Sequence, residues 1–446
     1  MAILIEGKAP PGSKWRRAVD ALRKAARKLK PYVPLLLAPL GPVGMVYLVP
    51  GPAVKELDVK LLRASSTREI IEVLRAYKKC EGGEALKSRI HLALHLRKLY
   101  RLREKLIRGE KLPTHTVIPD LHAQAGALAR ILGAISDEPI LEGDYFDRRY
   151  GNLKVFNLLR KKKIILWGNH ETKFMFAMRG DVYAFISWMA NGGAYFLREC
   201  GINIDPIIKK YTEVMAKMPE KHQTIDKIFK QVLEEDPPLV KGLLLDAMDN
   251  SKLRKIFRWL AKAGRLYHLD ENGILYLHSL VPLTEADPEV FARMDKLQAD
   301  VRRVLKTERP SMEELVEIQN RLSLYQDARD DDLLFPLLIK GEEAEIKRYV
   351  RNLGIMGIVY AHTVQPEVRV HAKCLFGIDL GMSTEDRGSY FVIGREGIKS
   401  YREAADGKFA ERQIMTGADF QKLQSEEIDL IIEGVKNYFA RKFPIT

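Results

Sequence analysis

Residues 116–122 read Thr-Val-Ile-Pro-Asp-Leu-His, residues 139–148 read Pro-Ile-Leu-Glu-Gly-Asp-Tyr-Phe-Asp-Arg, and residues 163–171 read Lys-Ile-Ile-Leu-Trp-Gly-Asn-His-Glu. Each stretch is a short apolar run that ends in polar residues, and helix-like segments separate the three runs. Such alternation predicts a layered α/β core that starts near residue 114. Strand-like runs that complete this core follow at 274–277, 357–360, 374–378 and 390–393.

Candidate metal ligands follow the ends of these runs, where α/β sheets place their ligands. Asp120 and His122 are two residues apart in an extended segment, so both side chains point the same way. The complete set of candidate metal ligands is Asp120, His122, Asp144, Asn169, His278 and His362. These oxygen and nitrogen donors, without sulfur, suit Mn, Fe or Zn. Two metals that share a carboxylate can activate water and hold both oxygens of an in-line displacement at phosphorus.

The order of the motifs resembles that of the calcineurin-like metallophosphoesterases, and more narrowly the phosphoprotein phosphatase branch. The matching motifs are Asp120-x-His122, Gly143-Asp144-x-x-Asp147-Arg148, Gly168-Asn169-His170-Glu171, His278 and His362. The stretch Trp188-x-x-Asn191-Gly192-Gly193 also resembles bacterial protein phosphatases and diadenosine tetraphosphate hydrolases. Any one of these motifs is weak evidence, whereas all five in order at predicted strand ends are strong evidence.

The resemblance implies a four-layer α/β/β/α sandwich over residues 114–446, with helical insertions at about 207–264 and 287–352. It also implies a role for each matching residue. Asp120 and His122 would bind the first metal, Asp144 would bridge both, and Asn169, His278 and His362 would complete the second. His170 would protonate the leaving oxygen, Asp147 would orient His170, and Arg148 would bind phosphate oxygens. The attacking group would be a metal-bridging hydroxide, and Mn is the favoured metal, with Fe or Zn as alternatives.

Several positions depart from the family pattern without removing a ligand. Pro119 and Ala123 replace the glycines that flank the first motif, Arg149 replaces the glycine after Arg148, and Ser279 follows His278. The eukaryotic protein phosphatases also use a second phosphate-binding arginine between the two late histidines. Arg309 is the candidate for that role in this chain.

The substrate has three candidate classes, all with phosphoester chemistry. A serine/threonine-phosphatase-like phosphomonoesterase is favoured. A sugar-bisphosphate phosphatase is an alternative, because residues 167–170, 276–284 and 377–383 are similar to class III fructose-1,6-bisphosphatases. A dinucleoside-polyphosphate hydrolase is another. The insertions could cap the cleft and favour a small molecule, or leave it open for a phosphoprotein.

Residues 1–113 are predicted to form a basic, mainly helical region. Residues 1–115 contain 25 Lys and Arg but 10 Asp and Glu, although the whole chain has a net charge of +14. This bias indicates an anionic partner for the region. A basic amphipathic helix is expected at 13–30, either in contact with nucleic acid or a membrane surface, or with a solvated basic face, which is favoured. A nucleic-acid-processing protein or a non-catalytic scaffold are therefore the competing hypotheses of other classes.

No disulfide framework and no membrane-spanning segment are expected. Cys80, Cys200 and Cys374 are far apart and odd in number, which favours a reducing, cytoplasmic location. Residues 31–54 carry no charge, but Pro34, Pro39, Pro42 and Pro50 interrupt them, so two short strands at 32–37 and 45–49 fit better than a transmembrane helix.

Overall fold

The chain folds into two compact units, residues 1–100 with 436–446 and residues 101–435. The computed structural model describes residues 3–5, 35–37, 46–48, 52–80, 83–219, 223–308, 310–327, 343–382 and 387–444. Each unit is described by itself below. In this described part of the chain, no helix is long and apolar enough to cross a membrane.

The larger unit contains a seven-stranded sheet with the order β15-β14-β13-β4-β5-β6-β7. Its parallel half is β4 (His115–Ile118), β5 (Ile140–Leu141), β6 (Ile164–Leu166) and β7 (Gly264–Arg265). Its antiparallel half is β13 (Ser389–Gly394), β14 (Gly397–Glu403) and β15 (Phe409–Thr416), with β13 paired to β4. Val117, Ile140 and Ile165 are completely buried, as expected for parallel strands covered on both faces.

A second, five-stranded sheet has the order β11-β12-β10-β9-β8. Its central strands are parallel and its two edge strands are antiparallel. The strands are β8 (Tyr267–Leu269), β9 (Ile274–Leu277), β10 (Gly357–Tyr360), β11 (Arg369–His371) and β12 (Leu375–Gly377). All residues of β9, β10 and β12 are buried.

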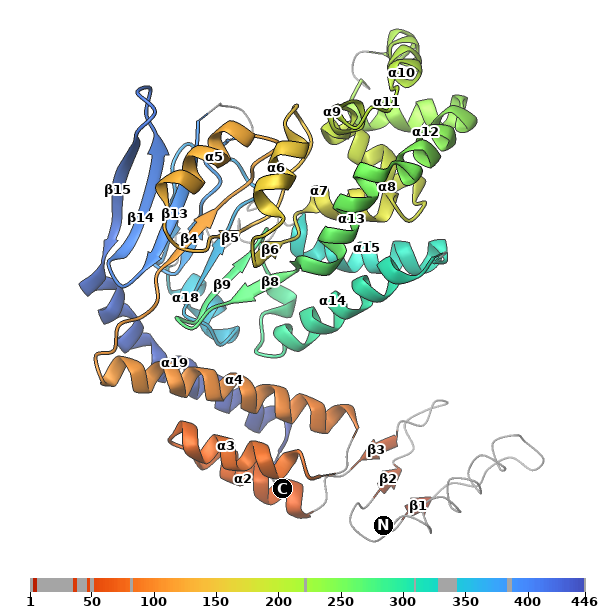
Figure 1. Cartoon of the computed structure of the whole chain (residues 1–446). Coiled ribbons are helices and arrows are strands. Elements are labelled where there is room, and N and C mark those ends of the chain that lie inside the picture. The colour runs from red at the N-terminus through yellow and green to blue at the C-terminus, as the bar shows by residue number, and fades with distance from the viewer. Residues whose placement is uncertain are drawn as a thin grey trace, which may run out of the picture. The chain divides into compact units, whose positions relative to one another are not determined.

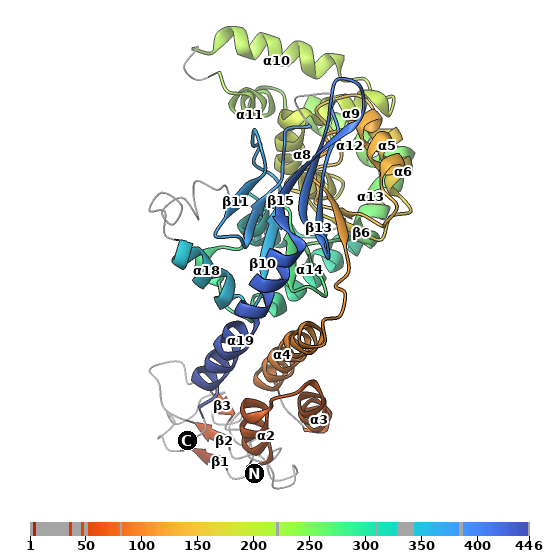
Figure 2. The same ribbon diagram turned by 90° about the vertical axis from the view of Figure 1, so that its left-hand side faces the viewer.

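Helices flank the two sheets and produce the predicted α/β/β/α order (Figures 1 and 2). On the outer side of the seven-stranded sheet lie α5 (Ala125–Ala134) and α6 (Asn152–Leu159). On the outer side of the five-stranded sheet lies α18 (Glu343–Asn352), where the hydroxyl of Tyr349 donates to the carbonyl of Val281 at 2.6 Å. A continuous apolar core joins residues of both sheets. The fold class predicted from the sequence is therefore confirmed.

The remaining helices of the larger unit pack around α7 (Asn169–Ala177) and α8 (Val182–Trp188). After η1 (Met189–Gly193) and α9 (Ala194–Glu199) come α10 (Asp205–Lys217), α11 (Ile225–Glu235), α12 (Pro237–Asp249) and α13 (Ser251–Ala263). Between β9 and α18 lie α14 (Val290–Lys306) and α15 (Met312–Gln326). On α13, the buried Leu253, Ile256, Phe257 and Leu260 follow the spacing of an amphipathic helix. The indole of Trp167 donates to the carbonyl of Leu260 at 3.0 Å, which attaches α13 to the end of β6.

The smaller unit contains α2 (Pro52–Arg63), α3 (Thr67–Tyr77) and most of α4 (Glu84–Ile107), together with the end of α19 (Gly417–Lys442). The buried Arg89 guanidinium pairs with Asp58 at 3.0 Å and lies 3.8 Å from the centre of the Phe443 ring. α2, α3 and α4 agree with the mainly helical character expected for this region. The short strands β2 (Leu35–Leu37) and β3 (Val46–Leu48) pair antiparallel, as expected, and β1 (Ile3–Ile5) joins them. The helix expected at 13–30 lies outside the described residues.

Candidate metal centre

The ends of five strands from both sheets bring the predicted ligands together. Asp120 and His122 follow β4, and Asp144 follows β5. Asn169 and His170 open α7 directly after β6, and His278 and His362 follow β9 and β10. Because parallel strands end at a common edge, side chains far apart in the sequence can meet there.

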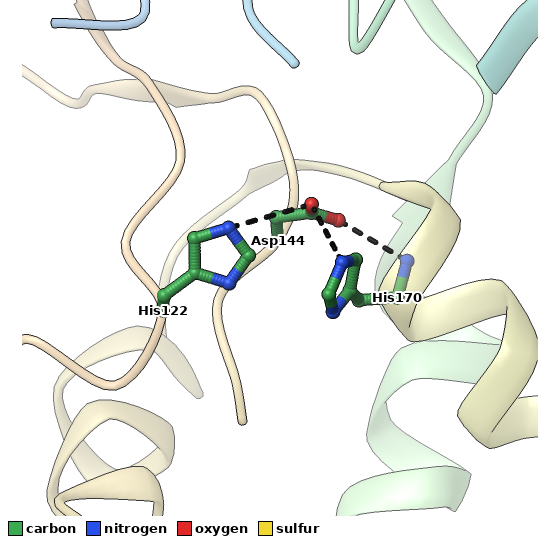
Figure 3. A group of neighbouring side chains, drawn as sticks. All are labelled: His122, Asp144 and His170. Carbon is green, nitrogen blue, oxygen red and sulfur yellow. Dashed lines mark hydrogen bonds and ion pairs between the residues drawn. The ribbon is translucent and has the colours of Figure 1, made fainter. Parts of the chain in front are cut away.

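Asp144 lies at the centre of this group (Figure 3). Its Oδ2 atom is 3.6 Å from Nε2 of His122 and 3.6 Å from Nε2 of His170, so the carboxylate lies between the two imidazoles. Its Oδ1 atom is 3.5 Å from Nε2 of His278, and Nδ1 of His362 is 3.1 Å from the same Nε2 atom. Two ligand groups of metal-binding size therefore share Asp144, one with His122 and His170 and one with His278 and His362.

Asp120 adds a second carboxylate to the centre. Its Oδ1 atom is 3.6 Å from Nδ1 of His278, and its Oδ2 atom is 4.0 Å from Nε2 of His122. Burial and the carboxylates of Asp379 and Asp144 raise the pKa of Asp120 well above its usual value. Crowded, buried carboxylates are costly unless cations compensate their charge. The donor set therefore fits divalent metal ions.

The amide of Asn169 provides independent evidence for this fit. Its Nδ2 atom donates to Oδ1 of Asp327 at 2.6 Å. Its own Oδ1 atom is buried and has no hydrogen-bond partner in the described part of the chain. Buried polar atoms normally have partners, and an orphaned amide oxygen beside carboxylates and imidazoles is suited to a cation.

His122 and His362 provide neutral nitrogen donors. Burial lowers the pKa of His122, and burial together with the charge of His278 lowers the pKa of His362 to about 4. A neutral imidazole offers the lone pair that a metal ion requires. By contrast, the pKa of Asp144 is lowered far below its usual value: burial alone would raise it, but the positive charge that the four surrounding imidazoles carry when protonated outweighs burial.

Asp147 orients two imidazoles at once. Its Oδ2 atom is 2.5 Å from Nδ1 of His170, and its Oδ1 atom is 3.1 Å from Nδ1 of His122. When each Nδ1–H donates to Asp147, both Nε2 atoms remain available toward Asp144. Burial raises the pKa of Asp147 to about 7. Asp147 therefore contacts His170, the residue that it was expected to orient, and also His122, which was not expected.

The backbone around the centre adopts left-handed conformations at residues that rarely use them. The residues with positive φ include His122 at 40°, Ala123 at 63°, Asp144 at 47°, Asp147 at 75°, Arg148 at 53° and His362 at 69°. Such strain concentrates at functional sites. Ala123 thus adopts the conformation that favours the glycine it replaces. Gly143 and Gly168 abut, since a Cβ on Gly143 would lie 2.6 Å from the backbone N of Gly168.

Glu171 fixes the loops that carry the ligands. Its Oε2 atom accepts from the backbone N–H groups of Asp144 at 2.7 Å and Gly168 at 3.0 Å, and its Oε1 atom accepts from Tyr145 at 2.8 Å. All three bonds are buried, so one carboxylate joins the turn after β5 to the start of α7. The sequence motif included Glu171, but its role was not predicted.

Replacing Glu171 by glutamine is expected to lower the free energy of unfolding by about 1–3 kcal/mol, because an amide N–H then faces a buried backbone N–H. Urea denaturation of both proteins measures this difference. The exposed Glu234 on α11 provides the matched control, since Glu234→Gln should change stability by less than about 0.5 kcal/mol. Equal stabilities of the two variants would contradict the assigned role.

A polar cleft of about 650 Å³ opens over the centre. Beside the ligands it is lined by Arg148, Lys173, Asn191, Asp226, Asp327 and Thr363, among others. Asp226 lies on α11 and Asp327 directly follows α15, so both helical segments contribute to its wall. Arg148 and Lys173 form no ion pair with a carboxylate in the described ranges. Two positively charged side chains in a cleft, with no carboxylate paired to them in the described ranges, are suited to bind an anionic ligand.

The Trp188-x-x-Asn191-Gly192-Gly193 stretch supports Arg148. Gly192 has a φ of 104°, and a Cβ there would lie 2.6 Å from both Cα and N of Arg148. A Cβ on Gly193 would lie 2.5 Å from the ring of Trp188. The two glycines therefore let η1 pack between the buried indole and the backbone of the cleft arginine, and they place Asn191 in the cleft wall.

The structure brings together every described residue of the predicted site: Asp120, His122, Asp144, Asp147, Arg148, Asn169, His170, His278 and His362. Arg309 lies outside the described residues. Lys173, Gln326, Asp327 and Asp379 were not predicted as part of the site. Lys173 could have been found, because it lies three residues after His170 on one face of a helix.

The match to a protein family agrees with this geometry. Residues 114–366 match the model of the calcineurin-like phosphoesterase family. Among solved structures, a cold-active protein-tyrosine phosphatase of a psychrophilic Shewanella species is 18% identical, with 67% of this chain and 80% of that chain covered and a TM-score of 0.39. A protein serine/threonine phosphatase from Saccharomyces cerevisiae is 14% identical, with 72% and 89% covered and a TM-score of 0.31. No curated protein matches the sequence significantly.

Proposed function

The chain belongs to the calcineurin-like phosphoesterase family and is a phosphoester-hydrolysing enzyme; from this premise we propose that it is a dinuclear-metal-dependent phosphomonoesterase of the serine/threonine-phosphatase type. The observation that carries the proposal is the pair of ligand groups that share Asp144. When bound, two divalent cations supply an activated water nucleophile and neutralise charge on the phosphoryl oxygens. We propose manganese as the metal, with iron or zinc as alternatives.

The proposed ligands divide into two sets around Asp144. Asp120 and His122 hold the first ion, and Asn169, His278 and His362 hold the second. The support for this division is that each of these residues presents a carboxylate, imidazole or amide donor to the common centre. Nδ1 of His278 lies 3.0 Å from the carbonyl of Glu142, which leaves its Nε2 atom for the metal.

His170 and Asp147 form the proposed proton-transfer pair. Burial lowers the pKa of His170 to about 4, with further contributions from Arg148 and Lys173 that Asp144 opposes. The pKa of Asp147 is raised to about 7, so the buried pair can retain a proton near neutral pH. When Asp147 holds this proton and donates it to Nδ1, the single hydrogen of the neutral His170 ring lies on Nε2. As the phosphoester bond breaks, Nε2 gives its proton to the leaving oxygen and Nδ1 takes the proton from Asp147.

Arg148 and Lys173 are the proposed substrate-binding cations. The exposed guanidinium of Arg148 lies 3.5 Å from Nε2 of His170, which places it beside the proton donor. Its planar donor array can bind two phosphate oxygens. Lys173 lies one helical turn beyond His170 in the same cleft wall. Arg309 keeps its proposed role as a third phosphate contact.

Lys173→Ala is expected to raise KM about 10-fold or more, because a charge-assisted hydrogen bond to the substrate is worth about 1.5–3 kcal/mol. The effect on kcat should be smaller, since Lys173 is not part of the proton-transfer pair. Steady-state kinetics with a phosphoserine peptide measures both constants. The exposed Lys209 on α10 provides the control, and a KM for Lys173→Ala equal to that of Lys209→Ala would exclude Lys173 from the binding site.

The substrate class is tested by phosphate release from a defined panel: p-nitrophenyl phosphate, a phosphoserine peptide, fructose 1,6-bisphosphate and diadenosine tetraphosphate, each with and without Mn²⁺. We expect Mn²⁺-dependent release with preference for the phosphoserine peptide. Preference for fructose 1,6-bisphosphate or for the dinucleotide would replace this proposal with one of its alternatives. No metal-dependent release from any substrate would contradict the proposed phosphomonoesterase.

The region before the catalytic domain, residues 1–113, is proposed to bind an anionic partner through its excess of positive charge. Binding through phosphate contacts weakens steeply with salt. Full affinity for RNA and DNA in a chain shortened to start near Pro113 would exclude this role. We also propose a cytoplasmic location, which is supported by the unpaired state of Cys80, Cys200 and Cys374.

A further inference from the structure

The end of α15 contacts the turn that carries Asn169 and His170. The buried side chain of Gln326 donates from Nε2 to the carbonyl of Trp167 at 2.9 Å and to that of Gly168 at 3.4 Å. These carbonyls belong to the two residues directly before Asn169. Gln326, which lies 49 residues after the end of β9, therefore holds the segment between β6 and α7 in place.

The next residue, Asp327, forms a hydrogen bond with the proposed metal ligand Asn169. Its Oδ1 atom accepts from Nδ2 of Asn169 at 2.6 Å. An asparagine amide can rotate by half a turn, so its oxygen and nitrogen can exchange places unless a neighbour selects one orientation. A carboxylate accepts but cannot donate, and Asp327 therefore selects the orientation that places Oδ1 of Asn169, buried and without a hydrogen-bond partner in the described ranges, toward the other ligands.

Capping of α15 does not account for this contact. The backbone N–H of Asp327 already donates to the carbonyl of Ser323 at 3.0 Å, which closes the last turn of the helix. The carboxylate instead reaches to Asn169, which begins a different helix. Asp327 is exposed in the cleft wall, so its interactions contribute little to the free energy of folding. Its carboxylate instead acts on the side-chain amide of Asn169.

We propose that Gln326 and Asp327 are positioning residues of the second metal site, so that the end of α15 influences metal binding. Gln326 fixes the backbone of the turn, and Asp327 fixes the amide. The inference rests on the proposed function, because it assigns Asn169 to a metal ion. It adds Asp327, which contacts a proposed ligand, and Gln326, which contacts the backbone directly before that ligand, both from a segment remote in the sequence.

Metal binding tests the inference without reference to activity. The metal-free full-length protein is titrated with Mn²⁺ while free Mn²⁺ is followed by electron paramagnetic resonance. The wild type should bind two ions, and Asp327→Ala should weaken the second by about 10–100-fold, the usual cost of losing a residue that orients a ligand. Asp327→Asn, which retains an acceptor oxygen, should recover part of the affinity.

Asp226→Ala is the matched control. Asp226 is also exposed and lines the same cleft, but no hydrogen bond to a proposed ligand is recorded for it. The control removes the same charge from the same wall, and its second Mn²⁺ constant should stay within about twofold of the wild type. Equal constants for Asp327→Ala and Asp226→Ala would overturn the inference.

Gln326→Met provides a second, independent variant. It keeps the volume of the buried side chain and removes the donor to both carbonyls, so the second Mn²⁺ constant should weaken again. Its melting temperature is measured alongside, because a buried carbonyl without a partner also lowers stability. A destabilised Gln326→Met protein with unchanged Mn²⁺ affinity would remove Gln326 from the proposal. If the wild type itself fails to bind two ions, the proposed dinuclear centre fails first.

Discussion

Asp144→Asn is expected to lower kcat/KM for phosphate release at least about 1,000-fold, which corresponds to about 4 kcal/mol of transition-state stabilisation. The reason is that both ligand groups share this one carboxylate, with Oδ2 facing His122 and His170 and Oδ1 facing His278. An asparagine keeps the size of the side chain but provides one oxygen in place of two. The variant should therefore bind at most one Mn²⁺ per chain.

The control for Asp144→Asn is a carboxylate that is buried outside the centre. Asp270 follows β8, and it accepts from the hydroxyl of Tyr276 at 2.9 Å. Asp270→Asn should retain two Mn²⁺ ions, and any loss of activity should follow its loss of stability. An Asp144→Asn protein that binds two ions and releases phosphate at the wild-type rate would show that Asp144 is not shared between metals.

His170→Asn is expected to lower kcat about 100- to 10,000-fold on a phosphoserine peptide, the usual range for removal of a general acid. The loss on p-nitrophenyl phosphate should be smaller, because p-nitrophenolate leaves without needing a proton. This difference between leaving groups reports proton transfer and does not arise from misfolding. Kinetics with both substrates on one preparation measures it.

The number of Mn²⁺ ions that the His170→Asn protein retains distinguishes a proton donor from a metal ligand. His170 also lies in the ligand group with Asp144 and His122, so its Nε2 atom has access to the same centre. If His170 is the proton donor, His170→Asn keeps two Mn²⁺ ions per chain. Asp147→Asn should lower both kcat and Mn²⁺ affinity, since Asp147 orients His122 as well as His170. Loss of one ion together with equal kcat losses on both substrates would assign His170 to metal binding instead.

The central strands and their ligands were predictable because the information is local. Apolar runs such as 164–166 bury both faces of a parallel strand, and the ligands follow directly after each run. β9 and β10 match their predicted ranges for the same reason. The edge strands β8 and β11 were not predicted, because they are partly exposed and contain His268, Arg369 and His371. β14 and β15 contain many polar residues and no long apolar run, and the many charged residues of α19 obscured its helical pattern.

The residues that support the ligands were less predictable because their contacts cross long sequence distances. Asp327 is separated from Asn169 by 158 residues, and nothing in the segment around Asp327 indicates a partner near a strand end. Glu171 accepts from backbone groups at 26 and 27 residues' distance, and backbone N–H groups carry no sequence signal. Asp379 was visible only as part of a similarity to another phosphatase class. In each case the residue has its role only because two segments remote in the sequence lie next to each other in the fold.

One titration tests the central claim most directly. Metal-free protein is supplied with Mn²⁺ in steps, and bound Mn²⁺ and phosphate release from p-nitrophenyl phosphate are measured on the same sample. The proposed dinuclear centre predicts no release without metal and a rate that reaches its maximum as the second ion binds. Full release from the metal-free protein, or two bound ions without any release, would contradict the account.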